Sequence, residues 1–155
     1  MDDLNDILAN EAVFHNVGAV SKKALFQTIS GLAASQLGLD ARHVGERLAI
    51  RERLGSTGFG GGVAIPHGKI EGLGSVVGLF VKLAQPLDYG AIDGLPVDIV
   101  FVLLSPQGSS VEHLKALARV SRRLRDRAFV AKLRGAGSAD ALYALFSGSA
   151  SRDAA

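Results

Sequence analysis

Two nearly continuous apolar runs constrain the fold of this chain more than any other feature. They are residues 76–83 (VVGLFVKL) and 97–104 (VDIVFVLL), and a proline follows each of them within three residues. Strands whose apolar residues do not alternate with polar ones are covered on both faces. The sequence therefore predicts two strands, ending before Pro86 and Pro106, in an α/β fold with a mixed sheet and helices on both faces.

Capping residues and the spacing of apolar side chains predict helices before and after these strands. Ser21 and Asp40 are suited to cap two helices, and Gly38 is suited to end the first of them. Ser109, with Glu112 three residues later, has the pattern of a capping box. The predicted helices are residues 3–9, 22–37, 41–54, a long helix that begins after Ser109, 128–133 and 138–146.

The helix after Ser109 is predicted to be amphipathic, with His113 in its first turn at the edge of the apolar stripe. The members of that stripe are Val111, Leu114, Leu117, Ala118, Ser121 and Leu124.

Length and composition limit the classes of protein to consider. The chain has 155 residues, which suits one domain, predicted to span residues 1–147 with a frayed tail at 148–155.

The composition predicts where the protein is located and which partners it lacks. The chain has no cysteine, so disulfides and thiolate zinc sites are excluded and a reducing, cytoplasmic location is expected. A net charge of +2 indicates no nucleic-acid partner, and no apolar run has the roughly 20 residues that membrane insertion needs. The acidic N-terminus does not resemble a signal peptide.

Residues 51–69 (RERLGSTGFGGGVAIPHGK) hold the candidate chemistry. Five glycines lie between Gly55 and Gly62, and glycine suits tight turns and the close approach of a ligand to backbone amides. A short Val-Ala-Ile strand follows and is predicted to end at Pro66, which has no N–H to donate. His67 is thus expected at the tip of a rigid element, beside a loop that is rich in amides.

This arrangement is typical of a phosphohistidine site, which needs a neutral, accessible imidazole and groups that stabilise phosphoryl charge. His67 is the candidate nucleophile, while Arg51 and the loop amides are candidates to bind the phosphoryl oxygens. His113, at a helix N-terminus that attracts anions, is a candidate to orient His67 or to donate a hydrogen bond. No metal or cofactor is expected. The residues alone leave open that the glycines form only a tight loop and His67 an exposed turn.

Other sites that bind phosphate or act on acyl groups fit the sequence poorly. A Walker A loop read back from Lys69 has Val63 at its first glycine position, and a dinucleotide fingerprint fails in the same way at its last glycine. Two well-separated histidines are too few for a zinc site. A Ser-His-Asp hydrolase using Ser56 is not excluded by composition, but no Gly-x-Ser-x-Gly elbow occurs.

The block from Arg51 to Lys69 resembles the signature of the fructose/mannitol-type enzyme IIA family of the bacterial phosphotransferase system. The resemblance continues through residues 91–98 (AIDGLPVD), 103–106 (LLSP) and 113–117 (HLKAL), and it is strongest to the nitrogen-regulatory branch. It implies a mixed, mostly parallel five-stranded sheet flanked by helices on both faces. Phe59 and Gly61 depart from it, because an aliphatic residue and asparagine are common there, which puts the carrier-docking surface and the rigidity of the loop in doubt.

The resemblance also implies a function. His67 would be phosphorylated by an HPr-like phosphocarrier that is itself charged by an enzyme I-type kinase, with His113 and Arg51 as the other active-site residues. The implied phosphoryl-binding loop is Gly55, Ser56, Thr57 and Gly58. The phosphorylation state would regulate partners such as potassium transporters or sensor kinases. Two alternatives remain: a sugar-specific enzyme IIA that passes phosphate to an enzyme IIB, and a regulatory binding module that is never phosphorylated.

Overall fold

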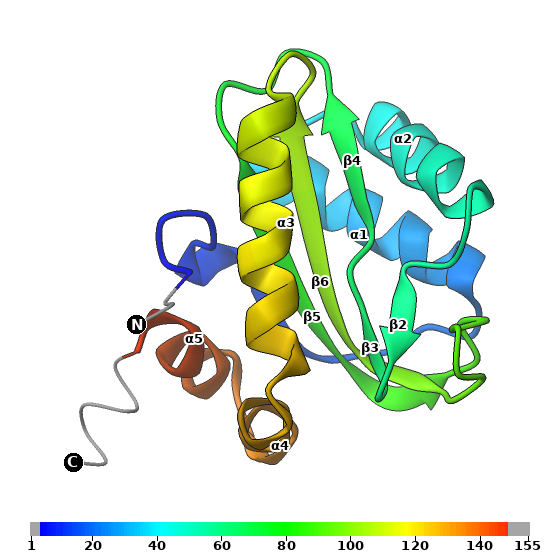
Figure 1. Ribbon diagram of the computed structural model, residues 1–155, viewed down its shortest axis with the longest axis vertical. Helices are drawn as coiled ribbons and strands as arrows, with labels where there is room; N and C mark the ends of the chain where they lie inside the picture. Colours follow the sequence, from blue (N-terminus) through cyan, green and yellow to red (C-terminus); the bar gives the residue numbers. More distant parts are fainter. Residues whose placement is uncertain (1–3, 149–155) are drawn as a thin grey trace.

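The computed structural model describes residues 4–148, which form a six-stranded mixed sheet with helices on both faces (Figure 1). The strands are β1 (Val13–Val17), β2 (Gly58–Gly60), β3 (Val63–Ala64), β4 (His67–Ile70), β5 (Val77–Leu87) and β6 (Val97–Pro106). The helices are the 3-10 turn η1 (Asn10–Ala12), α1 (Lys22–Leu37), α2 (Ala41–Arg53), α3 (Ser110–Arg125), α4 (Arg127–Gly135) and α5 (Ala139–Ser147). The predicted α/β class, with helices on both faces of a mixed sheet, is confirmed. The tail predicted to fray lies, apart from Gly148, outside the described residues.

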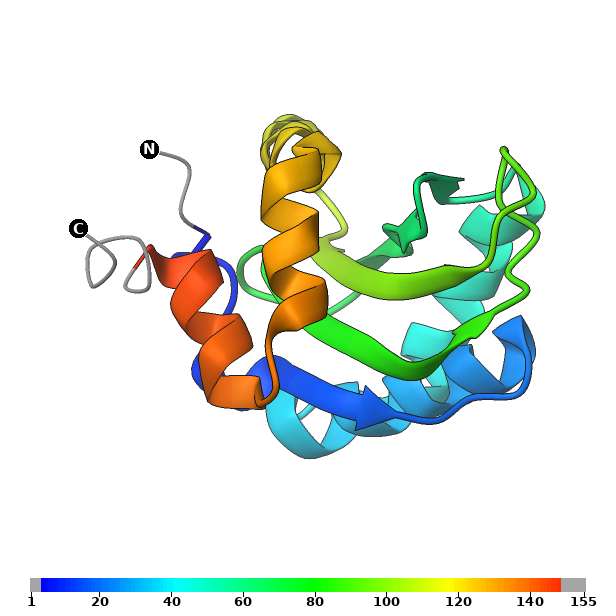
Figure 2. The same cartoon turned by 90° about the horizontal axis from the view of Figure 1, so that it is seen from below.

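Strand β6 lies at the centre of the sheet and is buried on both faces. Its side chains alternate between two apolar clusters, so that Phe101 and Leu103 face α3, α4 and α5, while Val102 and Leu104 face α1 and α2. Figure 2 shows these two groups of helices on opposite sides of the curved sheet. The continuous apolar run in the sequence has this physical cause, because neither face of the strand meets water.

The sheet has six strands rather than the predicted five, because one strand position is divided in two. Strands β3 and β4 both run parallel to β6, and only residues 65 and 66 separate them. The prediction that Pro66 ends the strand was therefore wrong: its carbonyl accepts a hydrogen bond from Leu103 N at 2.9 Å, and pairing resumes at His67. Proline lacks a donor but keeps its acceptor, so the ladder continues past it.

The remaining pairs are β1 with β5 in parallel, and β5 with β6 and β2 with β3 antiparallel. The two long strands also continue further than predicted. Strand β5 passes Pro86 after a register shift between Lys82 and Leu87, and β6 includes Pro106, which pairs with Ile70. A bulge or a strand end is where a sheet tolerates the missing N–H of proline.

The caps of α1 and α2 are confirmed, whereas two predictions about other helices were wrong. Ser21 Oγ accepts from Ala24 N at 3.0 Å, but Ser109 does not cap α3, because its hydroxyl donates to the carbonyl of Pro106 at 3.1 Å. The part of residues 3–9 that is described forms turns rather than a helix, and η1 follows them.

The inward face of α3 is rotated from the predicted stripe. Its buried residues are His113, Ala116, Val120 and Leu124, while the first apolar residues of the predicted stripe, Val111 and Leu114, are exposed. The first turn of α3 packs against the polar end of β6 around Ser105, so a histidine rather than an aliphatic side chain faces inward there. No helix within residues 4–148 is long and apolar enough to cross a bilayer.

Phe146 of α5 packs edge-to-face against Phe80, Phe101 and Phe129, with ring centroids 4.7 to 5.7 Å apart. We expect Phe146→Ala to lower the free energy of unfolding by about 3–5 kcal/mol, because it leaves a cavity in this cluster. Urea denaturation followed by circular dichroism measures the loss. Val20→Ala, at a side chain that is 93% exposed, is the control and should cost less than about 0.5 kcal/mol. Equal losses in the two variants would contradict this description of the core.

Candidate active site

The site lies along β4, which pairs only with β6 among the described strands. His67 pairs with Leu103, and Lys69 with Ser105. Side chains alternate along a strand, so His67, Lys69 and Ser105 face the α3 side of the sheet. Gly68 faces α2, where the Cβ of any other residue would lie 3.3 Å from that of Arg47, so glycine lets α2 approach β4 closely. Helices α2 and α3 therefore flank the histidine.

Two hydrogen bonds fix the imidazole of His67. Its Nδ1 lies 2.8 Å from the carbonyl oxygen of Ile65, and its Nε2 lies 3.1 Å from Nε of Arg51. A carbonyl only accepts and a guanidinium only donates, so Nδ1 carries the proton and Nε2 presents its lone pair. The nucleophilic nitrogen is thus Nε2, and it faces a cation.

Arg51 comes from the last turn of α2 and is held at both ends of its guanidinium. Its Nη1 donates to the carbonyl of Gly55 at 2.8 Å, while its Nε donates to His67. The arginine therefore satisfies a carbonyl just beyond the helix C-terminus and places its charge next to Nε2. This position next to Nε2 is compatible with the phosphate-binding role that the sequence predicts for Arg51.

His113 projects from the first turn of α3 toward His67, and the two ring centroids lie 5.5 Å apart. It is 8% exposed, and its Nδ1 lies 2.6 Å from Oγ of Ser105. Lys69 adds a second cation, with Nζ 3.0 Å from Oγ of Ser110. The structure thus brings His67, His113 and Arg51 together from three separate elements.

The site favours neutral imidazoles. Burial lowers the pKa of His67, and the Arg51 guanidinium lowers it further, although the carbonyl of Ile65 and the carboxylate of Glu52 oppose the shift. Burial also lowers the pKa of His113, assisted by the positive charges of His67 and Lys69. An imidazole with a lowered pKa keeps its lone pair at neutral pH, as a nucleophile requires.

Three of the four amides in the expected phosphoryl-binding loop, residues 55–58, have partners within the protein. Gly55 N donates to the carbonyl of Glu52, Thr57 N to the carboxylate of Glu52, and Gly58 N to Oγ of Ser56. These amides are not free to bind phosphoryl oxygens in this arrangement, contrary to the role expected of them. Anion binding therefore falls mainly to the side chains of Arg51 and Lys69, which would exchange their present partners for the anion.

Glu52 anchors this loop, although it was not predicted from the sequence as a residue of the site. Its side chain is 7% exposed, and its carboxylate accepts hydrogen bonds from Thr57 N at 3.1 Å, Thr57 Oγ1, Tyr89 OH at 3.2 Å and Lys22 Nζ at 2.8 Å. One buried carboxylate therefore connects α1, the end of α2, the loop and the segment before β6. The sequence does contain a hint of this role, because Glu52 is an acidic residue between Arg51 and Arg53 at the C-terminal end of α2.

Ser105 and Lys69 were not predicted as site residues either. Both follow from the register of β4 against β6, which places them on the same face of the sheet as His67. His43 and His15 lie outside the site. The Nε2 of His43 accepts from Glu71 N at 3.2 Å. Within residues 4–148, no three histidine or acidic side chains lie close enough together to hold a metal ion.

The contact between Arg51 and His67 predicts a change in titration. In Arg51→Gln the charge that disfavours the imidazolium is lost while the burial remains, so the pKa of His67 should rise from its lowered position toward the ordinary value of about 6.5. Long-range ¹H–¹⁵N spectra recorded across the pH range measure this pKa. Arg42→Gln, on the exposed part of the same helix, is the matched control. A pKa that stays the same or falls in Arg51→Gln would contradict the contact.

The Glu52 anchor predicts a stability that depends on pH. Burial raises the pKa of Glu52, but the hydrogen bonds from Lys22 and Thr57 outweigh it, so the pKa lies below its ordinary value. A group with a lowered folded-state pKa stabilises the protein above its unfolded-state pKa, and this contribution is lost as the pH falls through the folded-state value. We expect Glu52→Gln to unfold more easily at pH 7 by about 1–3 kcal/mol.

The difference between wild type and Glu52→Gln should shrink as the pH falls below the ordinary glutamate value of about 4.3 and through the lowered folded-state pKa, where the wild-type carboxylate becomes protonated. Urea denaturation at pH 7, 5 and 3.5 measures it. A difference that did not change with pH would show that the carboxylate charge is not what holds the loop.

Comparison with known proteins adds a family match and close relatives. Residues 6–149 match the family model described as "Phosphoenolpyruvate-dependent sugar phosphotransferase system, EIIA 2". The chain is 45% identical over 142 residues to a nitrogen regulatory protein of Bradyrhizobium diazoefficiens, covering 92% of this chain and 93% of that protein.

Two solved structures resemble the fold described above. The crystal structure of nitrogen regulatory protein IIA-Ntr from Neisseria meningitidis matches with a TM-score of 0.85 at 34% identity, covering 92% of this chain and 97% of that one. The enzyme IIA of the mannitol system of Escherichia coli, solved in complex with phosphorylated enzyme IIB, matches with a TM-score of 0.75 over 92% of this chain and 99% of that one. At 17% identity the second likeness concerns the fold alone.

Proposed function

This chain belongs to the EIIA 2 family of the phosphoenolpyruvate-dependent sugar phosphotransferase system, and we propose that it accepts a phosphoryl group on Nε2 of His67. It is a homologue of nitrogen regulatory proteins and a phosphocarrier of this system. The observation that carries the proposal is the tautomer of His67, which presents the Nε2 lone pair beside the Arg51 guanidinium.

In the proposed step, the lone pair of Nε2 forms a bond to phosphorus. The bond from phosphorus to the donor breaks at the same time, and its electron pair returns to the donor. The proton on Nδ1 stays in its hydrogen bond to Ile65, so the positive charge that develops on the ring is shared with a carbonyl oxygen. No proton has to leave the site before transfer.

Three side chains then stabilise the phosphoryl charge. Arg51 gives up its contact with the lone pair and donates to a phosphoryl oxygen instead, while Lys69 is close enough to contribute charge. In the productive tautomer of His113, the Ser105 hydroxyl donates to Nδ1 and Nε2–H donates to the phosphoryl group. Cations and oriented donors of this kind provide most of the catalysis in phosphoryl transfer.

The helix ends that carry Arg51 and His113 also expose large apolar side chains. Leu54 follows the end of α2, and Val111 and Leu114 lie in the first turns of α3, with exposures of 82%, 63% and 64%. Exposed apolar side chains next to a reactive group suit a transient docking surface. We assign it to the phosphoryl donor, an HPr-like phosphocarrier, and the same surface suits proteins that sense the phosphorylation state.

Phosphorylation would largely neutralise the positive charge of Arg51 and Lys69 beside this surface, because a phosphoryl group adds about −1.5 to −2 charges. The proposed output is regulation, by a cytoplasmic protein, of partners such as potassium transporters or sensor kinases. The similarity to nitrogen regulatory proteins supports a regulatory role over a purely sugar-specific one.

Phosphoryl transfer is tested with the purified chain, enzyme I, an HPr-like carrier and labelled phosphoenolpyruvate. We expect acid-labile label on wild type, none on His67→Ala, and wild-type labelling of His43→Ala, which removes a histidine outside the site. His113→Ala should fold normally and accept phosphate on the order of 100-fold more slowly, because one oriented donor is lost. Equal labelling of wild type and His67→Ala would contradict the assignment, and no label with an active carrier would favour a binding module that is never phosphorylated.

A further inference from the structure

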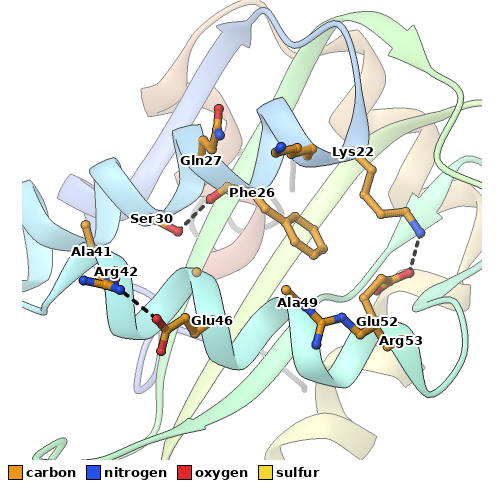
Figure 3. A pocket seen from close by; sticks show the side chains of 12 residues that line it. Lys22, Phe26, Gln27, Ser30, Ala41, Arg42, Glu46, Ala49, Glu52 and Arg53 are labelled. Atoms are coloured by element: carbon orange, nitrogen blue, oxygen red, sulfur yellow. Dashed lines mark hydrogen bonds and ion pairs between the residues drawn. The ribbon is translucent and has the colours of Figure 1, made fainter.

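A groove of about 760 Å³ lies between α1 and α2, and its wall includes Glu52 (Figure 3). We propose that this groove binds a small organic anion with an apolar body, and that the bound anion slows phosphoryl transfer at His67 through Lys22 and Glu52. The binding stands independently of the proposed function, whereas its effect on transfer rests on that function. The volume lies within the range of about 300–1,000 Å³ that is usual for small-molecule sites.

The floor of the groove, where α1 and α2 meet, is mainly apolar. Phe26 and Ala49 face the groove, and Gly45 lines it from α2. A Cβ at Gly45 would lie 2.9 Å from Oγ of Ser30, so the close approach depends on glycine. The Ser30 hydroxyl donates to the carbonyl of Phe26 at 2.7 Å, which leaves no unsatisfied hydroxyl in the floor.

The rim carries an excess of positive charge. Its two acids already have partners, since Glu46 binds Arg42 at 3.2 Å and Glu52 binds Lys22 at 2.8 Å. Two further cations, Lys23 and Arg53, line the groove and form no ion pair with any residue in the described part of the chain. An apolar floor beneath an uncompensated cationic rim is complementary to an amphipathic anion.

Lys22 connects the groove to the active site. Its ammonium, 31% exposed, lies at the end of the groove and is bound to the carboxylate that holds Thr57 in the phosphoryl loop. An anion in the groove competes with Glu52 for this ammonium and so weakens the contact that orients the loop. Because Arg51 is the neighbour of Glu52 on α2, its position against His67 changes with it.

Binding is tested with 8-anilinonaphthalene-1-sulfonate, an aromatic anion whose fluorescence rises at apolar sites. We expect saturable binding to the folded wild type, and weaker binding of N-phenyl-1-naphthylamine, which has the same rings without the sulfonate. Arg53→Glu, an exposed substitution that leaves the core intact, should raise Kd about fivefold, as expected for a partly exposed ion pair. Ala49→Phe should abolish binding by filling the floor, and Lys132→Glu on α4 is the control with the same charge change.

The proposal is overturned if Arg53→Glu and Lys132→Glu bind the sulfonate equally. It is also overturned if the uncharged probe binds as tightly as the anion, since the rim charge would then play no part. A loss of probe fluorescence with rising protein concentration, together with a doubling of mass by light scattering, would assign the groove to a second copy of the chain and likewise overturn it.

The link to the active site is read from the backbone amide of Thr57 in ¹H–¹⁵N spectra, which need no phosphoryl donor. Its resonance should move on addition of the sulfonate to wild type and stay in place in Ala49→Phe. With the phosphoryl donor present, the same probe should slow labelling of His67. A Thr57 resonance that does not move while the groove is filled would overturn the link, even if His67 accepts phosphate normally.

Discussion

The parallel pairing of β4 with β6 determines on which face of the sheet the histidine of the site lies. The register places His67 opposite Leu103 and Lys69 opposite Ser105, so these polar side chains emerge on the face covered by α3. Strand β4 has no further strand at its other edge in the described part of the chain, and α2 and α3 approach it there. A shift of one residue would turn the histidine toward α2 and separate it from His113.

Charged side chains, rather than the amides of the loop, organise the site for the proposed phosphoryl transfer. The amides of Gly55, Thr57 and Gly58 are already used, and the buried carboxylate of Glu52 fixes the loop that contains them. The lone pair of Nε2 is covered by Arg51, the group best suited to move onto an incoming phosphoryl group. Preorganised donors of this kind need little rearrangement when charge develops.

Local chemistry in the sequence predicted the elements and the three main site residues, but not their long-range contacts. The caps at Ser21 and Asp40 and the buried β6 follow from nearest-neighbour physics, so they were predictable. The roles of Glu52 and Tyr89 were not, because their hydrogen bond spans 37 residues. The buried face of α3 was predicted wrongly because its first turn contacts Ser105 rather than an apolar part of the strand. The prediction that hydrogen bonding ends at Pro66 was wrong because the carbonyl of this residue still accepts a hydrogen bond.

Gly61 illustrates a departure from the family pattern that the backbone explains. Its φ is +66°, a left-handed conformation that both glycine and asparagine adopt, so the turn itself does not change with this substitution.

The proposed phosphoryl acceptor is Nε2 of His67, and a long-range ¹H–¹⁵N spectrum of the phosphorylated protein tests this assignment most directly. Phosphorus on Nε2 of His67, with Nδ1 still protonated, is the predicted result. Phosphorus on Nδ1 of His67, or on His113, would contradict the account.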